Sequence, residues 1–186
     1  MRIDAGDFYL RLVTPDDASA MLDLLERNRD FFRPFEPRRP PEQWSVAAQR
    51  ELLLVGAERN AQELEYGFGM FLKEDDLLIG RVNLSNIVRR AFQNAYLGYF
   101  LDRHYNGKGY MTAGVDAVVD FAFGPGRLHR VQAAVMPENV ASVRVVEKVG
   151  FRLEGFAPRY LRIDGAWRDH NVYALTAEDR ERSDRF

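Results

Sequence analysis

The sequence predicts an α+β fold in which a mixed, mostly antiparallel sheet of about seven strands carries helices on both faces. Two observations support this prediction. Residues 94–151 run in the order apolar strand, glycine turn, helix, apolar strand, proline and second helix, which is the pattern of a strand–helix–strand unit. Short alternating apolar segments, separated by turn residues, precede this unit from residue 65 and follow it to residue 175.

Length and composition fit one globular domain over residues 1–186. The chain is 46% hydrophobic and 29% charged, which is ordinary for a soluble protein. Its formal net charge of −2 gives no reason to expect direct nucleic-acid binding. No apolar run approaches the ~20 residues of a membrane span, and the N-terminus lacks the apolar core of a signal peptide. We therefore expect no membrane association.

The absence of Cys excludes disulfides, a cysteine nucleophile and thiolate metal sites. It also fits a reducing cytoplasm, which is the expected location. The three histidines, His104, His129 and His170, show no metal-ligand spacing, so we expect no metal.

The first sixty residues are predicted to contain one strand and two helices. Phe8–Val13 is the strand, and Thr14–Asp17 caps the first helix with Pro15 at its first position. The proline-rich segment Arg33–Pro41 is interpreted as a loop. Glu42–Asn60 is the second helix. Its expected apolar stripe is Trp44, Ala48, Leu52 and Val55.

The strands that follow form hairpins. Glu65–Lys73 and Leu77–Ile87 are joined at Asp75-Asp76, and a polar turn leads to Ala95–Leu101. At the other end of the sheet, Phe151–Ile163 and Ala166–Leu175 form a hairpin around Asp164-Gly165, a pair suited to positive φ. The charged tail, residues 178–186, is expected to fray.

The central unit carries the chemistry. A turn at Asn106–Gly109 leads into a helix over Tyr110–Phe123, and Arg130–Val135 is the next strand. Asn139 is expected to cap a second helix that ends at Gly150. A glycine turn before a helix leaves backbone N–H groups free at the positive end of the helix dipole, and this arrangement binds phosphate. An ordinary strand-to-helix loop is the alternative, because a chain with 14 Gly contains such pairs by chance.

At this turn the chain resembles the GNAT (Gcn5-related) N-acetyltransferases, whose loop pattern is [QR]-x-x-G-x-[GA]. Here the pattern reads Asn-Gly-Lys-Gly-Tyr-Met over Asn106–Met111, so the central glycine matches and the two end residues depart. Within the family the similarity is greatest to the RimJ/RimL type, which acetylates the N-terminal alanine of ribosomal proteins. The stretches that carry this similarity are Asn28–Pro37, Val82–Arg89, Tyr96–Tyr99 and Ile163–His170.

The resemblance implies acetyl-CoA as cosubstrate, in a slot where the central parallel strands at 95–101 and 130–135 splay apart. It implies backbone contacts to the pantetheine from Tyr99, Phe100 and Leu101, with the Leu101 N–H as oxyanion donor. The turn, beginning at Asn106, would offer the pyrophosphate the N–H groups of Gly107, Lys108, Gly109, Tyr110, Met111 and Thr112. Lys108, Arg103 and Arg144 are candidates for the adenosine phosphates, or else solvated surface cations.

The resemblance also gives roles to two residues of the second helix. Asn139 would contact the pantetheine arm, and Ser142 would protonate the departing thiolate; the alternative for each is helix capping. Many members use a Tyr where Val146 stands and a Glu where Ala134 stands. The general base is therefore unassigned.

On the acceptor side, Phe35 is either local core or a substrate wall. Glu36 either anchors the incoming ammonium or is a plain loop carboxylate, and Asp169 is a further candidate. An α-amine, with a pKa near 7.7–8.0 against about 10.4 for Lys, tolerates a missing base best. The favoured function is direct acetyl transfer, in a ternary complex, to a protein N-terminus. Acetylation of a small amine and a non-catalytic acyl-CoA-binding module are alternatives, and the oligomeric state stays open.

Overall fold

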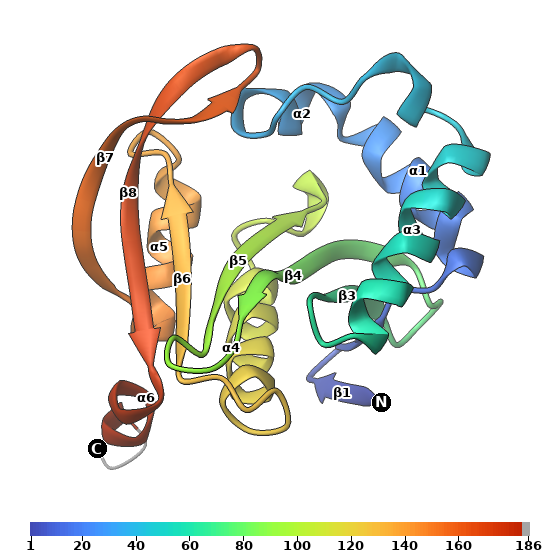
Figure 1. The fold of residues 1–186 in the computed structure, drawn as a ribbon. Coiled ribbons are helices and arrows are strands. Elements are labelled where there is room, and N and C mark those ends of the chain that lie inside the picture. The colour runs from blue at the N-terminus through green and yellow to red at the C-terminus, as the bar shows by residue number, and fades with distance from the viewer. Residues whose placement is uncertain (184–186) are drawn as a thin grey trace.

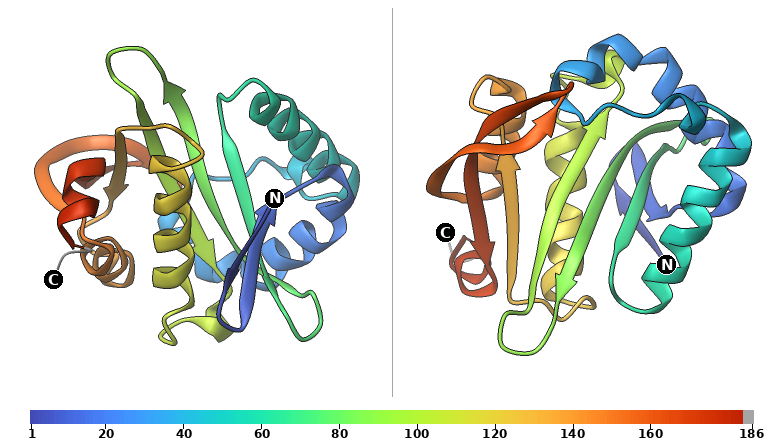
Figure 2. Two further views of the ribbon diagram at one scale, coloured as in Figure 1. Left: turned by 90° about the horizontal axis from the view of Figure 1, so that it is seen from below. Right: turned by 45° about the horizontal axis from the view of Figure 1, so that its top comes forward.

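The computed structural model describes residues 1–183 as one mixed sheet flanked by helices (Figures 1 and 2). The strands are β1 Arg2–Ala5, β2 Phe8–Leu12, β3 Tyr66–Leu72, β4 Leu78–Val88, β5 Asn94–Leu101, β6 Arg130–Val135, β7 Arg152–Ile163 and β8 Ala166–Thr176. The α-helices are α1 Ala18–Arg27, α2 Arg29–Phe32, α3 Val46–Ala61, α4 Tyr110–Phe123, α5 Val140–Val149 and α6 Ala177–Ser183. Short 3₁₀ turns are η1 Pro15–Asp17, η2 Arg33–Phe35, η3 Pro41–Gln43 and η4 Arg103–Tyr105.

The sheet has eight strands within the described chain, in the order β1-β2-β3-β4-β5-β6-β8-β7. Strands β5 and β6 run parallel, and the remaining neighbours are antiparallel. The predicted mixed α+β sheet is thus confirmed. The additional strand is β1, whose four residues pair with β2 from Arg2↔Arg11 to Ala5↔Phe8 and are too few to show a sequence period.

The two parallel strands separate halfway along their length. They pair from Asn94↔Arg130 to Leu97↔Ala133, and no further. Beyond that point β5 continues to Leu101 on β4 alone, whereas the last residues of β6 continue on β8 alone. Figure 1 shows β5 and β6 diverging toward their C-terminal ends. The sheet is therefore open in its middle at one end.

Helices cover both faces because the strands alternate their apolar side chains. Phe8 and Leu10 of β2 pack in one core with α4 and α5, whereas Tyr9, between them, packs in a second core with α1 and α3. The two helix pairs lie on opposite sides of the sheet in Figure 2. The second core includes Leu24 of α1 and Leu53 of α3, both buried.

The central unit forms as its sequence pattern predicts. The helix α4 and the strand β6 have the predicted bounds. The side chain of Asn139 caps α5 by accepting a hydrogen bond from the Ser142 N–H, and Gly150 ends that helix with φ of 98°. The hairpin pair Asp164-Gly165 has φ values of 43° and 82°, as its turn type requires.

The second predicted helix differs from its prediction. The helix α3 begins at Val46, capped by Ser45, and residues 41–43 form a separate 3₁₀ turn. The predicted stripe is wrong, since Leu52 is 46% and Val55 is 52% exposed while Leu53 is buried. Leucines at three successive positions, 52–54, make this helix apolar on more than one side, so periodicity could not choose its buried face.

Two further segments are more regular than expected. The segment predicted as a loop over 33–41 contains η2 and the first residue of η3. The tail predicted to fray forms α6 through residue 183; residues 184–186 of that prediction lie outside the described residues.

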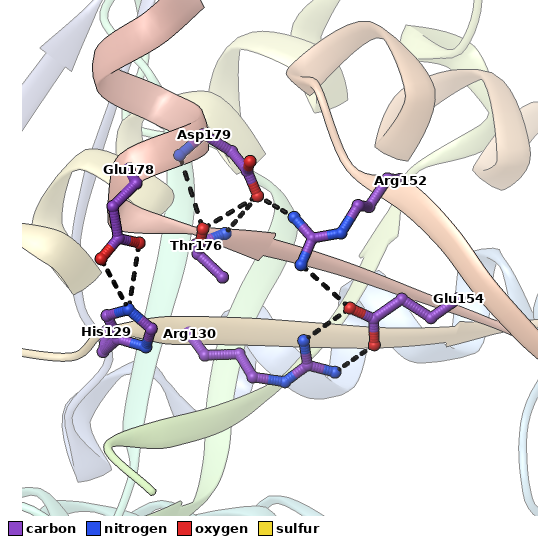
Figure 3. Close-up of polar contacts among 7 residues, drawn as sticks. All are labelled: His129, Arg130, Arg152, Glu154, Thr176, Glu178 and Asp179. Carbon is purple, nitrogen blue, oxygen red and sulfur yellow. Dashed lines mark hydrogen bonds and ion pairs between the residues drawn. The ribbon is translucent and has the colours of Figure 1, made fainter.

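Hydrogen bonds and ion pairs with other parts of the chain fix α6 in place (Figure 3). The Thr176 hydroxyl donates to an Asp179 carboxylate oxygen at 2.9 Å, at the start of the helix. Asp179 also pairs with Arg152 of β7, and Glu178 pairs with His129 before β6. Arg180 reaches Asp116 of α4 at 2.7 Å. These partners lie far away in sequence, so the tail's own composition does not reveal them.

Candidate active site

A pocket of about 470 Å³ opens where β5 and β6 separate. One wall is β5 from Leu97 to Leu101. The opposite wall is the end of β6 together with the first turn of α5, and the segment from Phe31 to Glu36 closes a third side. The pocket thus adjoins both the separated strands and the predicted acceptor segment.

The separated part of β5 presents unpaired backbone groups to the pocket. The Asp102 N–H donates to the Ile79 oxygen at 2.8 Å, directly across the antiparallel ladder between β4 and β5. Hydrogen-bonded pairs alternate along such a ladder, so the backbone of Phe100 faces β4, and the backbones of Tyr99 and Leu101 face away from it. Two of the three predicted backbone contacts therefore have the required orientation. Phe100 contributes its ring, which packs on Phe32 with centroids 5.2 Å apart.

The turn before α4 has the geometry of an anion site. Gly107 and Gly109 have φ values of 76° and 86°, and Gly109 stands at the N-cap of α4. An added Cβ at either position would meet no atom within 4 Å, so positive φ, and not space, calls for glycine. The Ala113 N–H is the first to bond back into the helix, at the Gly109 oxygen, so the N–H groups just before it stay free.

Side-chain hydrogen bonds fix this turn to the end of β5. The Asn106 amide donates to the Leu101 and Asp102 oxygens at 3.3 and 3.1 Å. Asp102 accepts the His104 N–H at 3.0 Å and the Arg27 Nε at 2.5 Å. Asn106 thus holds the turn through its side chain, which explains a polar residue at the start of the loop.

The first turn of α5 places Ser142 at the pocket. Asn139 Oδ1 accepts the Ser142 N–H at 3.2 Å, so the capping role of Asn139 is present. The Ser142 carbonyl accepts the Tyr99 hydroxyl at 3.1 Å, and burial raises the pKa of Tyr99, which keeps it a donor. Ser142 lines the pocket, and its side chain also interacts with Tyr99, which lowers the Tyr99 pKa in part. Capping therefore uses the backbone N–H of Ser142 and not its hydroxyl.

The predicted phosphate cations are exposed. Lys108 lies in the turn with its ammonium 5.5 Å from the centre of the Tyr105 ring, and Arg144 is on the outer side of α5. Arg103 is in η4. None of the three pairs with a carboxylate in the part of the chain that the structure describes, so all three remain free for a ligand.

Glu36 is a partly buried carboxylate at the pocket. Its Oε2 accepts from Arg39 at 2.6 Å, and its Oε1 is buried without a hydrogen-bond partner among the described residues. Burial raises the pKa of Glu36, and the nearby Arg39 charge opposes that rise only in part. A buried carboxylate oxygen without a donor is costly, and an incoming N–H group would satisfy it.

The aromatic residues near Glu36 have different roles. Phe32 is 7% exposed and belongs to the second core. Phe31 and Phe35 are 42% and 38% exposed and line the pocket, so they are not core residues.

Asp169 does not line the pocket. Its carboxylate accepts the Arg159 N–H at 2.7 Å within the hairpin of β7 and β8. The adjacent residue, His170, is 3% exposed and does line the pocket. Alternation along β8 places the two side chains on opposite faces of the strand, so only His170 is at the pocket.

The usual positions of an acid and a base carry no titratable group. Ala134 lines the pocket, and Val146 is fully buried in the first core. Within residues 1–183, no three His, Cys, Asp or Glu side chains are grouped to hold a metal ion. In the same range, no helix is both long and apolar enough to cross a membrane.

The separated parallel strands and the glycine turn together define an acetyltransferase fold of the GNAT class. The chain belongs to this family: the family model described as "Acetyltransferase (GNAT) domain" matches residues 7–152. The chain is similar to the probable N-acetyltransferase YjcK of Bacillus subtilis (strain 168), with 46% identity over 173 residues, which are 93% of this chain and 96% of YjcK.

Two solved structures extend the comparison. The ribosomal-protein-S5-alanine acetyltransferase of Vibrio fischeri superposes with a TM-score of 0.93 at 34% identity, covering 96% of this chain and 98% of that chain. RimJ of Mycobacterium smegmatis, in complex with CoA-disulfide, superposes with a TM-score of 0.88 at 32% identity, covering 96% of this chain and 86% of that chain. The protein is thus an N-acetyltransferase of the RimJ/RimL type.

Proposed function

We propose that the protein transfers the acetyl group of acetyl-CoA to the α-amine of a protein N-terminus, with the N-terminal alanine of a ribosomal protein as the leading acceptor. The observation that carries this proposal is the pocket itself, which is lined by Leu101, at the free backbone edge, and by Glu36, whose carboxylate has one buried oxygen without a partner. One side suits a thioester and the other suits an ammonium. The similarity to an S5-alanine acetyltransferase supports the choice of acceptor.

The residues present fit acetyl-CoA. The edge groups of Tyr99 and Leu101 can pair with the amides of a pantetheine arm as an added strand would. The free N–H groups at the start of α4 suit a pyrophosphate. Lys108 and Arg144 are exposed and are available to contact the remaining phosphate of the cosubstrate. Asn139 and Ser142 line the same pocket as Tyr99 and Leu101.

Direct attack of the amine on the thioester is the simplest chemistry for this pocket. The chain has no Cys that could carry the acetyl group as a thioester. The Leu101 N–H is our candidate donor to the oxyanion, and the Ser142 hydroxyl is our candidate proton donor to the departing thiolate.

Glu36 is proposed to receive the acceptor amine. Its free oxygen can accept an N–H from the incoming ammonium, and Phe31 and Phe35 form the wall beside it. An ammonium is best recognised by a carboxylate that already lacks a donor, because binding then removes a desolvation cost. A cytoplasmic location is part of the proposal, since a ribosomal acceptor requires it.

Release of free thiol from acetyl-CoA tests the proposal. The protein is incubated with acetyl-CoA and a panel that contains an alanine-initiated peptide, a lysine peptide blocked at its N-terminus, and small amines. Thiol release with the alanine peptide is the expected result. Turnover of a small amine alone would move the acceptor assignment to the small-molecule alternative.

A further inference from the structure

We propose that His170 is the general base of the reaction and takes the proton of the acceptor amine at its Nε2 atom. This inference rests on the proposed function and adds the base that the family position at Ala134 does not supply. Three observations carry it: the place of His170 in the pocket, the hydrogen bond that fixes its ring, and the absence of a partner for its second nitrogen.

The imidazole lies on the acceptor face of the separated strands. In the ladder between β6 and β8, Val172 stands directly opposite Ala134. His170 is two residues further along β8 and is therefore on the same face as these two residues. It is 3% exposed and lines the same pocket as Glu36 and Ser142.

The ring is held in one orientation and one tautomer. His170 Nδ1 lies 3.0 Å from the Arg168 carbonyl oxygen. A carbonyl oxygen only accepts hydrogen bonds, so Nδ1 must carry the hydrogen, and the neutral ring then keeps its lone pair at Nε2. The Tyr160 ring of β7 packs against the imidazole, with ring centroids 5.7 Å apart. In the described residues nothing donates to Nε2, which leaves a basic nitrogen available.

The titratable groups around the same pocket are less suited to the task. They are Glu36 between η2 and η3, Glu138 before α5, and Tyr99 on β5, with Tyr160 against the imidazole from β7. Burial raises the pKa of both tyrosines, so they remain protonated near neutral pH and cannot serve as bases.

Glu36 and Glu138 differ from His170 in availability. Glu36 is already held by Arg39 at 2.6 Å, and the Arg39 charge opposes in part the rise that burial gives to the Glu36 pKa. Glu138 is exposed at the mouth of the pocket, where water competes for it. Imidazole is the side chain that exchanges a proton most readily near neutral pH, where an α-amine also titrates.

Glu36 and His170 then have separate roles in the transfer. Glu36 Oε1 accepts one N–H of the bound ammonium, and a second ammonium proton passes to His170 Nε2, which leaves a neutral amine. The amine nitrogen forms its bond to the thioester carbonyl carbon, and the carbon–sulfur bond breaks. The remaining extra proton on nitrogen goes to the thiolate, through Ser142 or water, and the imidazolium returns its proton to solvent. One amide, one free thiol and one released proton balance the step.

The test compares His170→Gln and His170→Ala with wild type and with His129→Gln. His129 is the matched control, because it is an exposed histidine paired with Glu178 away from the pocket. We expect kcat of the His170 variants to fall roughly 10- to 100-fold at pH 7, with the acetyl-CoA KM changed less than about two-fold. Imidazole added to His170→Ala should restore activity in a saturable way and should not accelerate His129→Gln.

The pH profile separates a base from a packing residue. A folding defect would lower the rate equally at every pH, whereas loss of the base removes the base-dependent limb of the wild-type profile and leaves only the titration of the amine. Unchanged kcat, or a reduced kcat with the wild-type profile and no imidazole rescue, would overturn the assignment. If wild type turns over only small amines, the proposed acceptor is wrong, and the same comparison with that amine still tests His170.

Discussion

Arg27 Nε lies 2.5 Å from Asp102 Oδ2, and this ion pair joins the end of α1 to the end of β5. Asp102 is 2% exposed. Its carboxylate also accepts a hydrogen bond from the His104 backbone N–H and contacts the His104 ring nitrogen Nδ1. The Nη2 group of Arg27 donates a hydrogen bond to the Leu78 carbonyl oxygen at 2.6 Å. The pair therefore fixes the residue that directly follows the Leu101 backbone edge and precedes the glycine turn.

Replacing Asp102 by Asn should lower the free energy of unfolding by about 2–3 kcal/mol, because Arg27 loses its charged partner in a buried place. Denaturant unfolding measures this. Denaturant unfolding repeated at several pH values supplies a second check. Burial raises the pKa of Asp102, but hydrogen bonds from Arg27 and His104 outweigh it and lower the pKa from 3.8 to about 2.

A depressed carboxyl pKa stabilises the fold above the unfolded-state value and loses that stabilisation as pH falls through the folded value. The difference between wild type and Asp102→Asn should therefore be constant above about pH 4.5 and shrink between about pH 4 and 2. Asp16→Asn, which removes an exposed pair with Arg50, is the control and should leave the unfolding midpoint unchanged. A difference that does not vary with pH would contradict the ion-pair explanation.

Acetyl-CoA should raise the melting temperature of the wild-type protein, because a ligand that binds only the native state stabilises it. Gly109→Val should abolish this rise, since a β-branched residue at φ of 86° distorts the turn that holds the free N–H groups. Thermal unfolding with and without millimolar acetyl-CoA measures both. Gly56→Ala in the middle of α3, where no atom lies within 4 Å of an added Cβ, should keep the full ligand shift. A full shift in Gly109→Val would show that the turn is only structural.

Ser142→Ala should keep acetyl-CoA affinity and lower kcat roughly 10- to 100-fold. The substitution leaves the α5 cap intact, because Asn139 bonds the backbone N–H of residue 142 and not its hydroxyl. Steady-state kinetics together with a direct binding titration separate the two quantities. If kcat is unchanged, the thiolate leaves without help from this hydroxyl.

Glu36→Gln should raise the KM for a peptide acceptor about ten-fold or more and leave acetyl-CoA affinity unchanged, because the proposed role of this carboxylate is to bind the acceptor ammonium. The raised pKa of Glu36 adds a pH dependence: as pH falls toward that pKa, the carboxylate is protonated and acceptor binding weakens. Glu42→Gln, at an exposed carboxylate nearby, is the matched control. An equal KM for both variants would place the ammonium elsewhere.

Local sequence patterns were sufficient to predict the central unit and insufficient at the acceptor side. Asn139 and Gly150 mark the ends of α5 by their own chemistry, so the prediction needed no tertiary information. The choice between Asp169 and His170 depends on which face of β8 each occupies, and pairing with β6 and β7 decides this.

The formation of α6 and the unpaired oxygen of Glu36 could not be predicted from local sequence patterns either. Arg152 and Asp116 stabilise the tail from strands and helices that precede it, and Arg39 and the pocket wall determine which Glu36 oxygen is left unpaired. Contacts of this kind arise only when the whole fold is in place, so a single sequence without its structure cannot supply them.

The most direct test of the central claim is to map the acetyl group on a peptide that begins with alanine and carries one internal lysine. Deprotonating the lysine costs about 3–4 kcal/mol more than deprotonating the α-amine, from a pKa gap of ~2.5 units. The peptide is incubated with the protein and acetyl-CoA, and the product is fragmented in a mass spectrometer. We predict the label on the N-terminal α-amine. Label mainly on the lysine, or on neither group while a small amine is turned over, would contradict the claim.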